Sequence, residues 1–377
     1  DVEGIGFVTA DRIAASLGLP KDHPSRILAG LVYTLRQALQ DGHVYLPRTM
    51  LQQKSAELLG LPLPTVSAVV ERCAQEGKEK LDPAALVVEP DPAAGGTASE
   101  RVYLLPYYTS EVGVAERIAW LVRRGERKSR VAGSTLLAPS LIADEDITPQ
   151  QQQAVTNALR FPVSVMTGGP GTGKSYTVST LIAALEALGK KYALAAPTGR
   201  AAKRLSEATG RKASTIHRLL TFTPPEDDDD LLVFDEPEEL DFDLVVVDEA
   251  SMLDLPLAYR LLKAIPAGCH LLLIGDVDQL PSVGAGNFLR DVIESGAVPV
   301  TRLTEIFRQA ASSHIIANAH RINQGQPPLL DNDPEGDFFF FGIENAQDAA
   351  AQVERLVTEV IPQKFGIRAA DIQVLAP

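Results

Sequence analysis

Cysteine is scarce in this 377-residue chain, and long apolar runs are missing. Cys73 and Cys269 lie far apart and outside any CxxC pair, so the sequence supports neither a disulfide framework nor a zinc site. No stretch approaches the ~18 consecutive apolar residues of a membrane span, and no signal peptide stands at the start. We therefore expect a protein of a reducing compartment that is neither exported nor embedded in a membrane.

The composition also shows no strong bias. Hydrophobic residues make up 45% of the chain and charged residues 22%, as in ordinary globular proteins. This composition excludes a disordered chain, collagen and a coiled coil. At ~100–200 residues per domain, the length predicts two or three domains. The chain starts at Asp1, and residues 371–377 resemble a strand cut off at its end, so we expect a fragment.

Acidic residues outnumber basic ones, and the net charge of −14 argues at first against a polyanionic partner. Eleven acidic residues lie between Pro224 and Asp243, with no Lys or Arg among them. This segment carries a charge of −11, so the rest of the chain has a net charge of only −3. We expect this segment to be a solvated insertion. The remainder holds two basic clusters, each either a solvated helix face or a nucleic-acid contact: Arg123, Arg124, Arg127, Lys128 and Arg130, and Arg200, Lys203, Arg204, Arg211, Lys212 and Arg218.

The pattern of apolar residues divides the chain into parts. Residues 1–145 read as mostly helical, with short strands at 42–47 and 101–106 that are compatible with a winged-helix-like arrangement and a loop or wing tip at 89–100. From residue 146 to 310, apolar strands alternate with turns and helices, which predicts an α/β fold with a parallel sheet covered on both faces. The expected strands are 163–166, 192–195, 244–247 and 271–274.

A further α/β unit is expected over residues 311–377. Its predicted elements are a strand at 337–341, a helix at 346–360 and a strand at 372–375. The unit is too short to be complete. In the parallel sheet of residues 146–310 we expect the chemistry at the carboxyl ends of the strands.

The segment 168–175, GGPGTGKS, fits the pattern GxxxxGK[ST] and lies between an expected strand and an expected helix. A glycine-rich turn can converge backbone N–H groups on phosphate oxygens, and the helix amino terminus adds positive potential. Lys174 should reach the β and γ phosphates, and the Ser175 hydroxyl should ligate Mg²⁺. The alternative, a glycine turn by chance, does not account for the order of strand, loop and helix.

Two further strands end in polar residues. The strand 244–247 delivers Asp248, suited to Mg²⁺, and Glu249, suited to polarising an attacking water. Because side chains alternate along a strand, the two carboxylates need a turn at Asp248 to converge. The strand 271–274 is followed by Gln279, which could hydrogen-bond a γ-phosphate. The alternatives are a strand that merely ends in a charged turn and a plain strand exit.

Seven ordered motifs together resemble the helicases of superfamily 1, and their details resemble the RecD-like group (SF1B), including bacterial members that act without the other RecBCD subunits. The motifs are TPQQ (148–151), GGPGTGKS (168–175), APTGRAA (196–202), TIH (215–217), DEAS (248–251), GDVDQLPSVG (275–284) and LTEIFRQ (303–309).

The resemblance implies a RecA-like P-loop motor domain over 146–310, the start of a second RecA-like domain over 311–377, and the cofactors ATP and Mg²⁺. It implies that Gln151 reads adenine, that Gln279 senses the γ-phosphate and that Arg308 acts as an arginine finger. Catalysis would rest on Lys174, Asp248, Glu249, Gln279 and Arg308. Nucleotide binding would involve Gln151, Gly169, Gly171, Thr172, Gly173, Lys174, Ser175 and Tyr176, and the metal ligands would be Ser175 and Asp248.

The resemblance also implies a track and a direction. The motor would bind single-stranded DNA and single-strand/duplex junctions, translocate 5′ to 3′ and unwind duplexes in repair or recombination. We expect a monomer in the bacterial cytoplasm at the nucleoid, with unknown protein partners. The residues expected to face DNA are Pro197, Thr198, Gly199, Arg200, Thr215, His217 and Val283.

The amino-terminal residues 4–15, GIGFVTADRIAA, resemble a helix-hairpin-helix element that offers backbone N–H groups to DNA phosphates. An ordinary helix start at Thr9 explains them as well. The basic stretch from Arg117 to Arg130 could contact duplex DNA, in a salt-sensitive way that reads no sequence. Two other functions remain open at this point: a P-loop ATPase that remodels protein, and a DNA-binding module switched by nucleotide.

Overall fold

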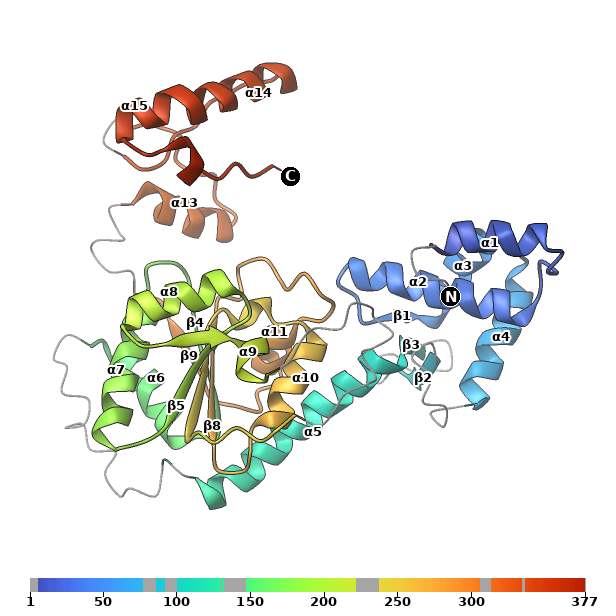
Figure 1. Cartoon of the computed structure of the whole chain (residues 1–377), viewed down its shortest axis with the longest axis horizontal. Coiled ribbons are helices and arrows are strands. Elements are labelled where there is room, and N and C mark those ends of the chain that lie inside the picture. Colours follow the sequence, from blue (N-terminus) through green and yellow to red (C-terminus); the bar gives the residue numbers. More distant parts are fainter. Residues whose placement is uncertain are drawn as a thin grey trace. The chain divides into compact units, whose positions relative to one another are not determined.

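The computed structural model describes residues 6–76, 86–91, 100–129, 131, 147–221, 237–305, 313–333 and 336–376. The chain divides into two compact units, residues 1–306 and 307–377 (Figure 1). The three-part division expected from the sequence stays a prediction. Of the helices described, none is long and apolar enough to cross a membrane.

The amino-terminal part of the first unit packs helices around a small antiparallel sheet of strand order β1-β3-β2. The strands expected at 42–47 and 101–106 are confirmed as β1 and β3, and β2 begins before the loop expected at 89–100, of which 92–99 lie outside the described residues. The order of helices and strands agrees with a winged-helix-like arrangement, which stays a prediction. The elements are α1 (Phe7–Ser16), α2 (Pro24–Gln40), β1 (Tyr45–Pro47), α3 (Arg48–Leu59), α4 (Leu63–Glu76), β2 (Leu86–Pro90) and β3 (Glu100–Leu104).

Apolar side chains on one face of α2 build the core of this part. Ile27, Leu31 and Leu35 recur at helical spacing and are buried against α3, α4 and the sheet. The helix begins with the His23 side chain accepting from the Ser25 N–H and with Pro24 in its first turn. α1 contributes no fully buried residue and packs against α2 at the surface of this part.

The long helix α5 (Leu105–Lys128) connects this part to the parallel sheet by packing along α10 (Leu255–Ala264). Arg117 donates to the carbonyl oxygens of Leu262 (2.9 Å) and Ile265 (2.7 Å). The last carbonyl groups of a helix have no partner within the helix, so Arg117 caps the carboxyl end of α10. Its guanidinium also lies 3.9 Å from the Trp120 ring centroid. Arg117, which we expected to contact duplex DNA, is therefore engaged in holding α5 on α10, and Arg130 lies outside the described residues.

The motor part is a six-stranded parallel sheet of order β6-β5-β7-β8-β4-β9 with helices on both faces (Figure 1). This confirms the predicted α/β fold. The strands are β4 (Val163–Gly168), β5 (Tyr192–Ala196), β6 (Ala213–Thr215), β7 (Leu244–Val247), β8 (His270–Gly275) and β9 (Val300–Leu303); the helices are α6 (Pro149–Arg160), α7 (Lys174–Ala187), α8 (Gly199–Thr209), α9 (Ile216–Leu219), the 3₁₀ turn η4 (Ala250–Met252), α10 and α11 (Phe288–Glu294).

Successive strand residues alternate between two hydrophobic cores. In β7, Val245 and Val247 pack in the core that includes α5, α10 and α11, whereas Leu244 and Val246 pack in the core that includes α6, α7 and α8. Both faces are buried, so the strands read as continuous apolar runs. The order places β8 between β4 and β7, which brings the ends of all three strands side by side.

The second unit is helical where it is described, with α13 (His314–Asn323), α14 (Ala346–Arg355), the π-helical turn η5 (Leu356–Val360), α15 (Ile361–Phe365) and the 3₁₀ turn η6 (Ala369–Asp371). The helix expected at 346–360 is confirmed. The strands expected at 337–341 and 372–375 are wrong, because no strand forms in the described part of this unit. At Phe340 the reason is local: the Asn332 side chain takes both the Phe340 N–H (2.6 Å) and its carbonyl (2.9 Å).

Candidate nucleotide and nucleic-acid site

The loop between β4 and α7 has the geometry of a phosphate cradle. Gly171 (φ 76°) and Gly173 (φ 81°) have left-handed backbone angles that other residues rarely adopt. At Gly168 a side chain is excluded, since its Cβ would lie 2.7 Å from Thr172 Oγ1 and 2.8 Å from the Leu303 carbonyl oxygen. The Thr172 hydroxyl donates to the Gly169 carbonyl (2.8 Å) and fixes the turn.

Lys174, Ser175 and Tyr176 form the first turn of α7. The Lys174 ammonium donates to the carbonyls of Gly168 (2.5 Å) and Gly169 (3.1 Å), so it lies over the loop. Ser175 and Tyr176 are exposed. The first N–H groups of a helix have no intrahelical acceptor and carry positive potential. The Lys174 ammonium and the N–H groups at the start of α7 are the donors that a nucleotide phosphate requires, and the Ser175 hydroxyl is a ligand for its Mg²⁺. These residues therefore fit both the nucleotide and the metal ion.

Gln151 is buried at 1% exposure and joins α6 to the phosphate loop. Its Oε1 accepts from the Thr148 N–H (3.0 Å), and its own N–H donates to Thr148 Oγ1 (3.3 Å), which completes a capping box. Its Nε2 donates weakly to the Gly173 carbonyl at 3.5 Å. Adenine recognition by Gln151 stays a prediction, and the amide would exchange one of these partners to perform it.

The chain turns where the two adjacent carboxylates follow β7. The strand ends at Val247, the backbone bends at Asp248 and Glu249, and the Asp248 carboxylate accepts the Glu249 N–H at 2.9 Å. The turn predicted at Asp248 is confirmed, and it continues into Glu249, which is left-handed (φ 53°, ψ 40°). A left-handed non-glycine residue costs ~1–2 kcal/mol, and such strain gathers at functional sites.

Burial raises the pKa of both Asp248 and Glu249, and the Asp248 charge raises that of Glu249 further. The Lys174 charge lowers both pKa values, and Arg204 lowers that of Glu249. These influences mean that the phosphate-loop lysine lies near both carboxylates. The structure thus brings the ends of β4 and β7 to one place, at the carboxyl ends of the strands.

β8 contributes a third polar end between the other two. Asp276 is buried, and its carboxylate accepts from the Asp278 N–H (3.1 Å) and from the Gln279 side-chain amide (3.3 Å). Gln279 is exposed. Asp276 received no role from the sequence, although it follows a buried strand just as Asp248 does, and this repeated pattern was a usable signal. Its carboxylate orients Gln279.

The loops after β5 and β6 hold the residues expected to face DNA. Ala196 and Thr215 are paired across these parallel strands, so the two loops are neighbours. The Thr198 hydroxyl accepts from the Ala201 N–H at 3.2 Å and caps α8, and the Thr215 hydroxyl caps α9 in the same way. Pro197 is half-buried, whereas Gly199 and Arg200 are exposed.

Of the other residues expected at DNA, His217 lies near Asp254 at the start of α10, and Val283 precedes Gly284, which also lies against Asp254. Burial lowers the pKa of His217, the Asp254 charge raises it and Arg260 lowers it, so His217 lies near Asp254. Asp254 caps α10 (Leu257 N–H, 2.9 Å), and its Oδ2 would lie 2.6 Å from a Cβ at Gly284. Val283, the next residue, is 94% exposed.

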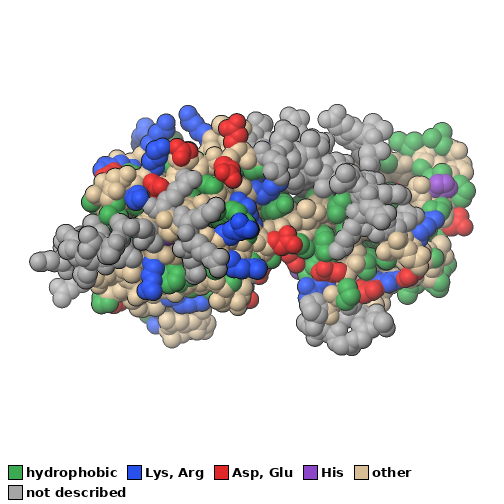
Figure 2. Space-filling model, turned by 90° about the horizontal axis from the view of Figure 1, so that it is seen from below, with side chains coloured by type: hydrophobic (Ala, Val, Ile, Leu, Met, Phe, Trp, Pro, Cys, Tyr) green, Lys and Arg blue, Asp and Glu red, His purple; other side chains and the backbone are tan. Residues whose placement is uncertain are grey.

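The basic cluster at 200–218 is exposed throughout. Arg211 pairs with Glu186 at 2.7 Å, and Lys203 lies 3.8 Å from Glu207, so part of the positive charge is neutralised. Figure 2 shows Lys and Arg side chains on the surface with Asp and Glu among them. The cluster can attract a polyanion, and its side chains read no base edges.

Some expected features lie outside the described residues: Arg308, and most of the acidic segment, of which 237–243 are described. Across the described parts of the chain, no group of three or more His, Cys, Asp and Glu side chains could hold a metal by itself. A Mg²⁺ bound by Ser175 and Asp248 would therefore need nucleotide oxygens as further ligands.

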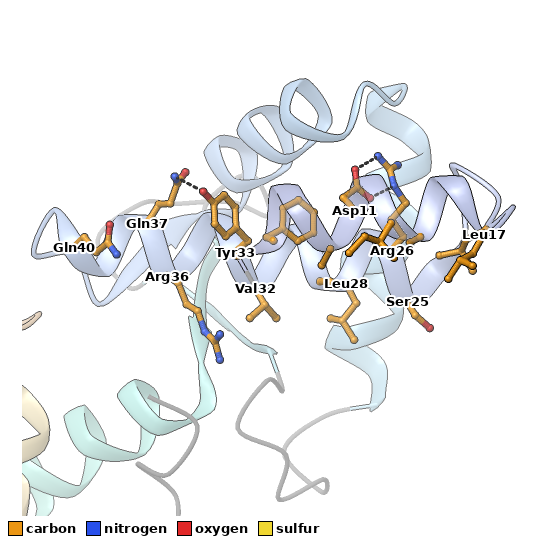
Figure 3. Close-up of a pocket in the computed structure, with 17 residues that line it drawn as sticks. Asp11, Leu17, Ser25, Arg26, Leu28, Val32, Tyr33, Arg36, Gln37 and Gln40 are labelled. Atoms are coloured by element: carbon orange, nitrogen blue, oxygen red, sulfur yellow. Dashed lines mark hydrogen bonds and ion pairs between the residues drawn. The ribbon is translucent and has the colours of Figure 1, made fainter. Parts of the chain in front are cut away.

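An open groove of about 790 Å³ lies between α1 and α2, away from these motifs (Figure 3). Its lining is mostly apolar, with Leu17 and Leu28 among its members, and Phe7 stacks on Tyr33 with 5.0 Å between the ring centroids. The Arg26 guanidinium donates to Asp11 at 2.6 Å and is occupied by that pair. Polar side chains of Ser25, Arg36, Gln37 and Gln40 complete its lining.

The phosphate loop, the acidic turn after β7 and the sheet order define a P-loop nucleoside triphosphatase. Two family models match the chain: an AAA domain over residues 151–285 and the "ATP-dependent RecD2 DNA helicase HHH domain" over residues 1–45. The second match agrees with the helix-hairpin-helix resemblance at residues 4–15.

The chain is also similar to curated RecD proteins. The ATP-dependent RecD2 DNA helicase of Deinococcus radiodurans is 36% identical over 87% of this chain and 44% of its own length. The RecBCD enzyme subunit RecD of Mycolicibacterium smegmatis is 36% identical over 59% of this chain and 43% of its own length. These matches confirm the resemblance to the RecD-like group on which the motif interpretation was based. The chain spans less than half the length of these two relatives.

Among solved structures, the Pif1 helicase of Candida albicans is 22% identical over 48% of this chain and 45% of its own, with a TM-score of 0.34. That score is too low to bear on fold or function.

Proposed function

We propose that the full-length protein is an ATP-dependent DNA helicase that moves 5′ to 3′ on single-stranded DNA and unwinds duplexes in repair or recombination. The observation that carries the proposal is the shared sheet edge. The carboxyl ends of β4, β7 and β8 hold the nucleotide residues, and those of β5 and β6, in the same sheet, hold the loops proposed to face DNA. The similarity to the ATP-dependent RecD2 DNA helicase of Deinococcus radiodurans supports it.

The nucleotide roles follow from the geometry of the phosphate loop. The N–H groups of 169–176 and the Lys174 ammonium bind the phosphates of ATP, and the exposed Tyr176 lies at the mouth of the loop beside them. Ser175 and Asp248 would hold Mg²⁺, which polarises phosphate oxygens when bound. Glu249, whose pKa is raised by burial, takes the proton of the attacking water. Arg308 neutralises charge on the γ-phosphate as an arginine finger does.

The DNA roles use the loops after β5, β6 and β8. Thr198 and Thr215 use their oxygens as helix caps and keep their hydroxyl hydrogens for phosphate oxygens. Arg200 adds positive charge, and the exposed Val283 offers an apolar contact to a base. Gln279, held by Asp276 next to both sites, reports the γ-phosphate to the DNA loops.

The wider assignments rest on the family. We place the protein in the bacterial cytoplasm at the nucleoid, as a monomeric motor on single-stranded DNA and single-strand/duplex junctions. The bacterial relatives and the amino-terminal HHH match support this placement.

The test is ATP hydrolysis by the full-length protein with and without single-stranded DNA, together with unwinding of duplexes that carry a 5′ or a 3′ tail. We expect strong stimulation by DNA and unwinding from the 5′ tail alone. Unwinding from the 3′ tail would refute the direction. Hydrolysis that DNA does not stimulate would refute the helicase and favour an ATPase that remodels protein.

A further inference from the structure

A small cavity of about 90 Å³ lies between the turn after β7 and the loop after β8. Its lining includes Ser251 of the DEAS motif and Gln279, together with Asn287 and Arg290. Neither Ser251 nor the cavity is needed for the nucleotide roles assigned above. The cavity is nevertheless the place where the segments that carry Glu249 and Gln279 face each other.

The Ser251 hydroxyl is buried and has no hydrogen-bond partner among the residues that the structure describes. A buried hydroxyl without a partner is unfavourable, so a native structure that keeps one calls for an explanation. The backbone of this residue lies close to the end of β8, because its N–H nitrogen would be 3.0 Å from a Cβ at Gly275. This close approach holds Ser251 in the lining of the cavity.

Gln279 is held more loosely. Its side-chain amide donates to Asp276 Oδ2 at 3.3 Å, which is long for a hydrogen bond, and the residue is exposed. This bond uses one N–H of an amide that has two donor hydrogens and an accepting oxygen. The loop itself is held over the cavity by Arg290, which donates to the Val277 carbonyl at 3.2 Å. The Gln279 side chain can thus gain a second partner without movement of the loop backbone.

We propose that Ser251 is a positioning residue for Gln279, and that its hydroxyl hydrogen-bonds the Gln279 amide across this cavity during DNA-stimulated hydrolysis. Ser251 follows Glu249 by two residues, so this bond would tie the turn of the catalytic carboxylate to the γ-phosphate-sensing loop. The inference rests on the proposed function, and it adds a residue through which the two motifs act together.

The experiment compares Ser251→Ala with a matched control, Ser164→Ala, in the full-length protein. Ser164 lies inside β4, is 1% exposed and also has a buried hydroxyl without a partner among the described residues. We expect S251A to lower the DNA-stimulated kcat by about fivefold to tenfold, the effect of one hydrogen bond, with the KM for ATP unchanged. S164A should match the wild-type kcat, and both variants should unfold at or above the wild-type temperature, because each loses a buried hydroxyl without a partner among the described residues.

Two further variants separate positioning from packing. Ser251→Thr keeps the hydroxyl, and the cavity has room for its methyl group, so it should restore kcat. In a Gln279→Ala background, S251A should change kcat by less than twofold, because the two residues act as a unit.

Three results would overturn the inference: S251A as active as the wild type, S251T as impaired as S251A, or an undiminished S251A effect in the Q279A background. The same undiminished effect, if it disappears in an Asn287→Ala background, would assign the Ser251 bond to Asn287 instead. Absence of DNA stimulation in the wild type would refute the proposed function itself, which is a different observation.

Discussion

From the left-handed backbone of Glu249 we predict that this carboxylate, which we propose to be catalytic, lowers the stability of the folded protein. Replacing it by Ala removes a half-buried carboxylate whose pKa is raised, and leaves the strained backbone in place. Replacing it by Gly also relieves the strain. The left-handed conformation costs ~1–2 kcal/mol for a residue with a Cβ, while Gly loses ~0.5–1 kcal/mol more on folding, so the Gly variant should exceed the Ala variant by ~0.5–1 kcal/mol.

The assay is unfolding by heat and by urea of wild type, Glu249→Ala and Glu249→Gly, with DNA-stimulated hydrolysis measured on each. We expect stability to rise in that order, by ~1–3 °C between the two variants, while both lose hydrolysis. Thr221→Gly is the matched control, because Thr221 has nearly the same φ of 49° outside the catalytic turn. It should gain stability without losing activity.

The charge contribution has its own signature in pH. A carboxyl group whose folded pKa is raised destabilises the protein above that pKa, and the penalty disappears as the pH falls through it. The stability gap between wild type and Glu249→Ala should therefore close on acidification, while the gap between the Ala and Gly variants should not depend on pH. Equal stability of the Ala and Gly variants would refute the argument from strain.

Three more predictions concern single side chains. Lys174→Ala should weaken ATP binding at least ~10-fold in equilibrium titration, since charge-assisted hydrogen bonds are worth ~1.5–3 kcal/mol; unchanged affinity would refute its phosphate role. Arg117→Ala should cost ~1.5–3 kcal/mol in unfolding measurements, because it leaves carbonyls at the end of α10 unpaired, and an unchanged melting temperature would contradict this. Arg200→Ala should reduce the slope of log affinity for single-stranded DNA against log salt by ~0.7, and an unchanged slope would remove Arg200 from the interface.

Local sequence patterns were sufficient for the sheet and for the phosphate loop. β4, β5, β7 and β8 are apolar runs because both of their faces are buried, and the glycine pattern at 168–175 encodes its own backbone angles. β6 and β9 were not predicted. They are the edge strands, and their residues, such as Ser214 and Arg302, lack an apolar run.

These local patterns could not predict contacts between segments that are distant in the sequence. The left-handed angle of Glu249 depends on its tertiary surroundings, and the cavity shared by Ser251 and Gln279 forms only when β7 and β8 pair. The apolar run before Phe341 predicted a strand, but the Asn332 side chain takes the hydrogen bonds that a neighbouring strand would use. Burial and pairing decided these cases rather than propensity.

The glycines of α5 limit how this protein can be recombined with its relatives. A Cβ at Gly113 would overlap the Tyr259 ring, and one at Gly125 would lie 2.5 Å from Pro162 Cβ. These two close approaches, together with the hydrogen bonds of Arg117 to the end of α10, fix the position of α5 along its axis relative to the sheet domain. A chimera that exchanges the amino-terminal helices should therefore join the chains before Leu105, so that α5 stays with the motor part to which it is fitted.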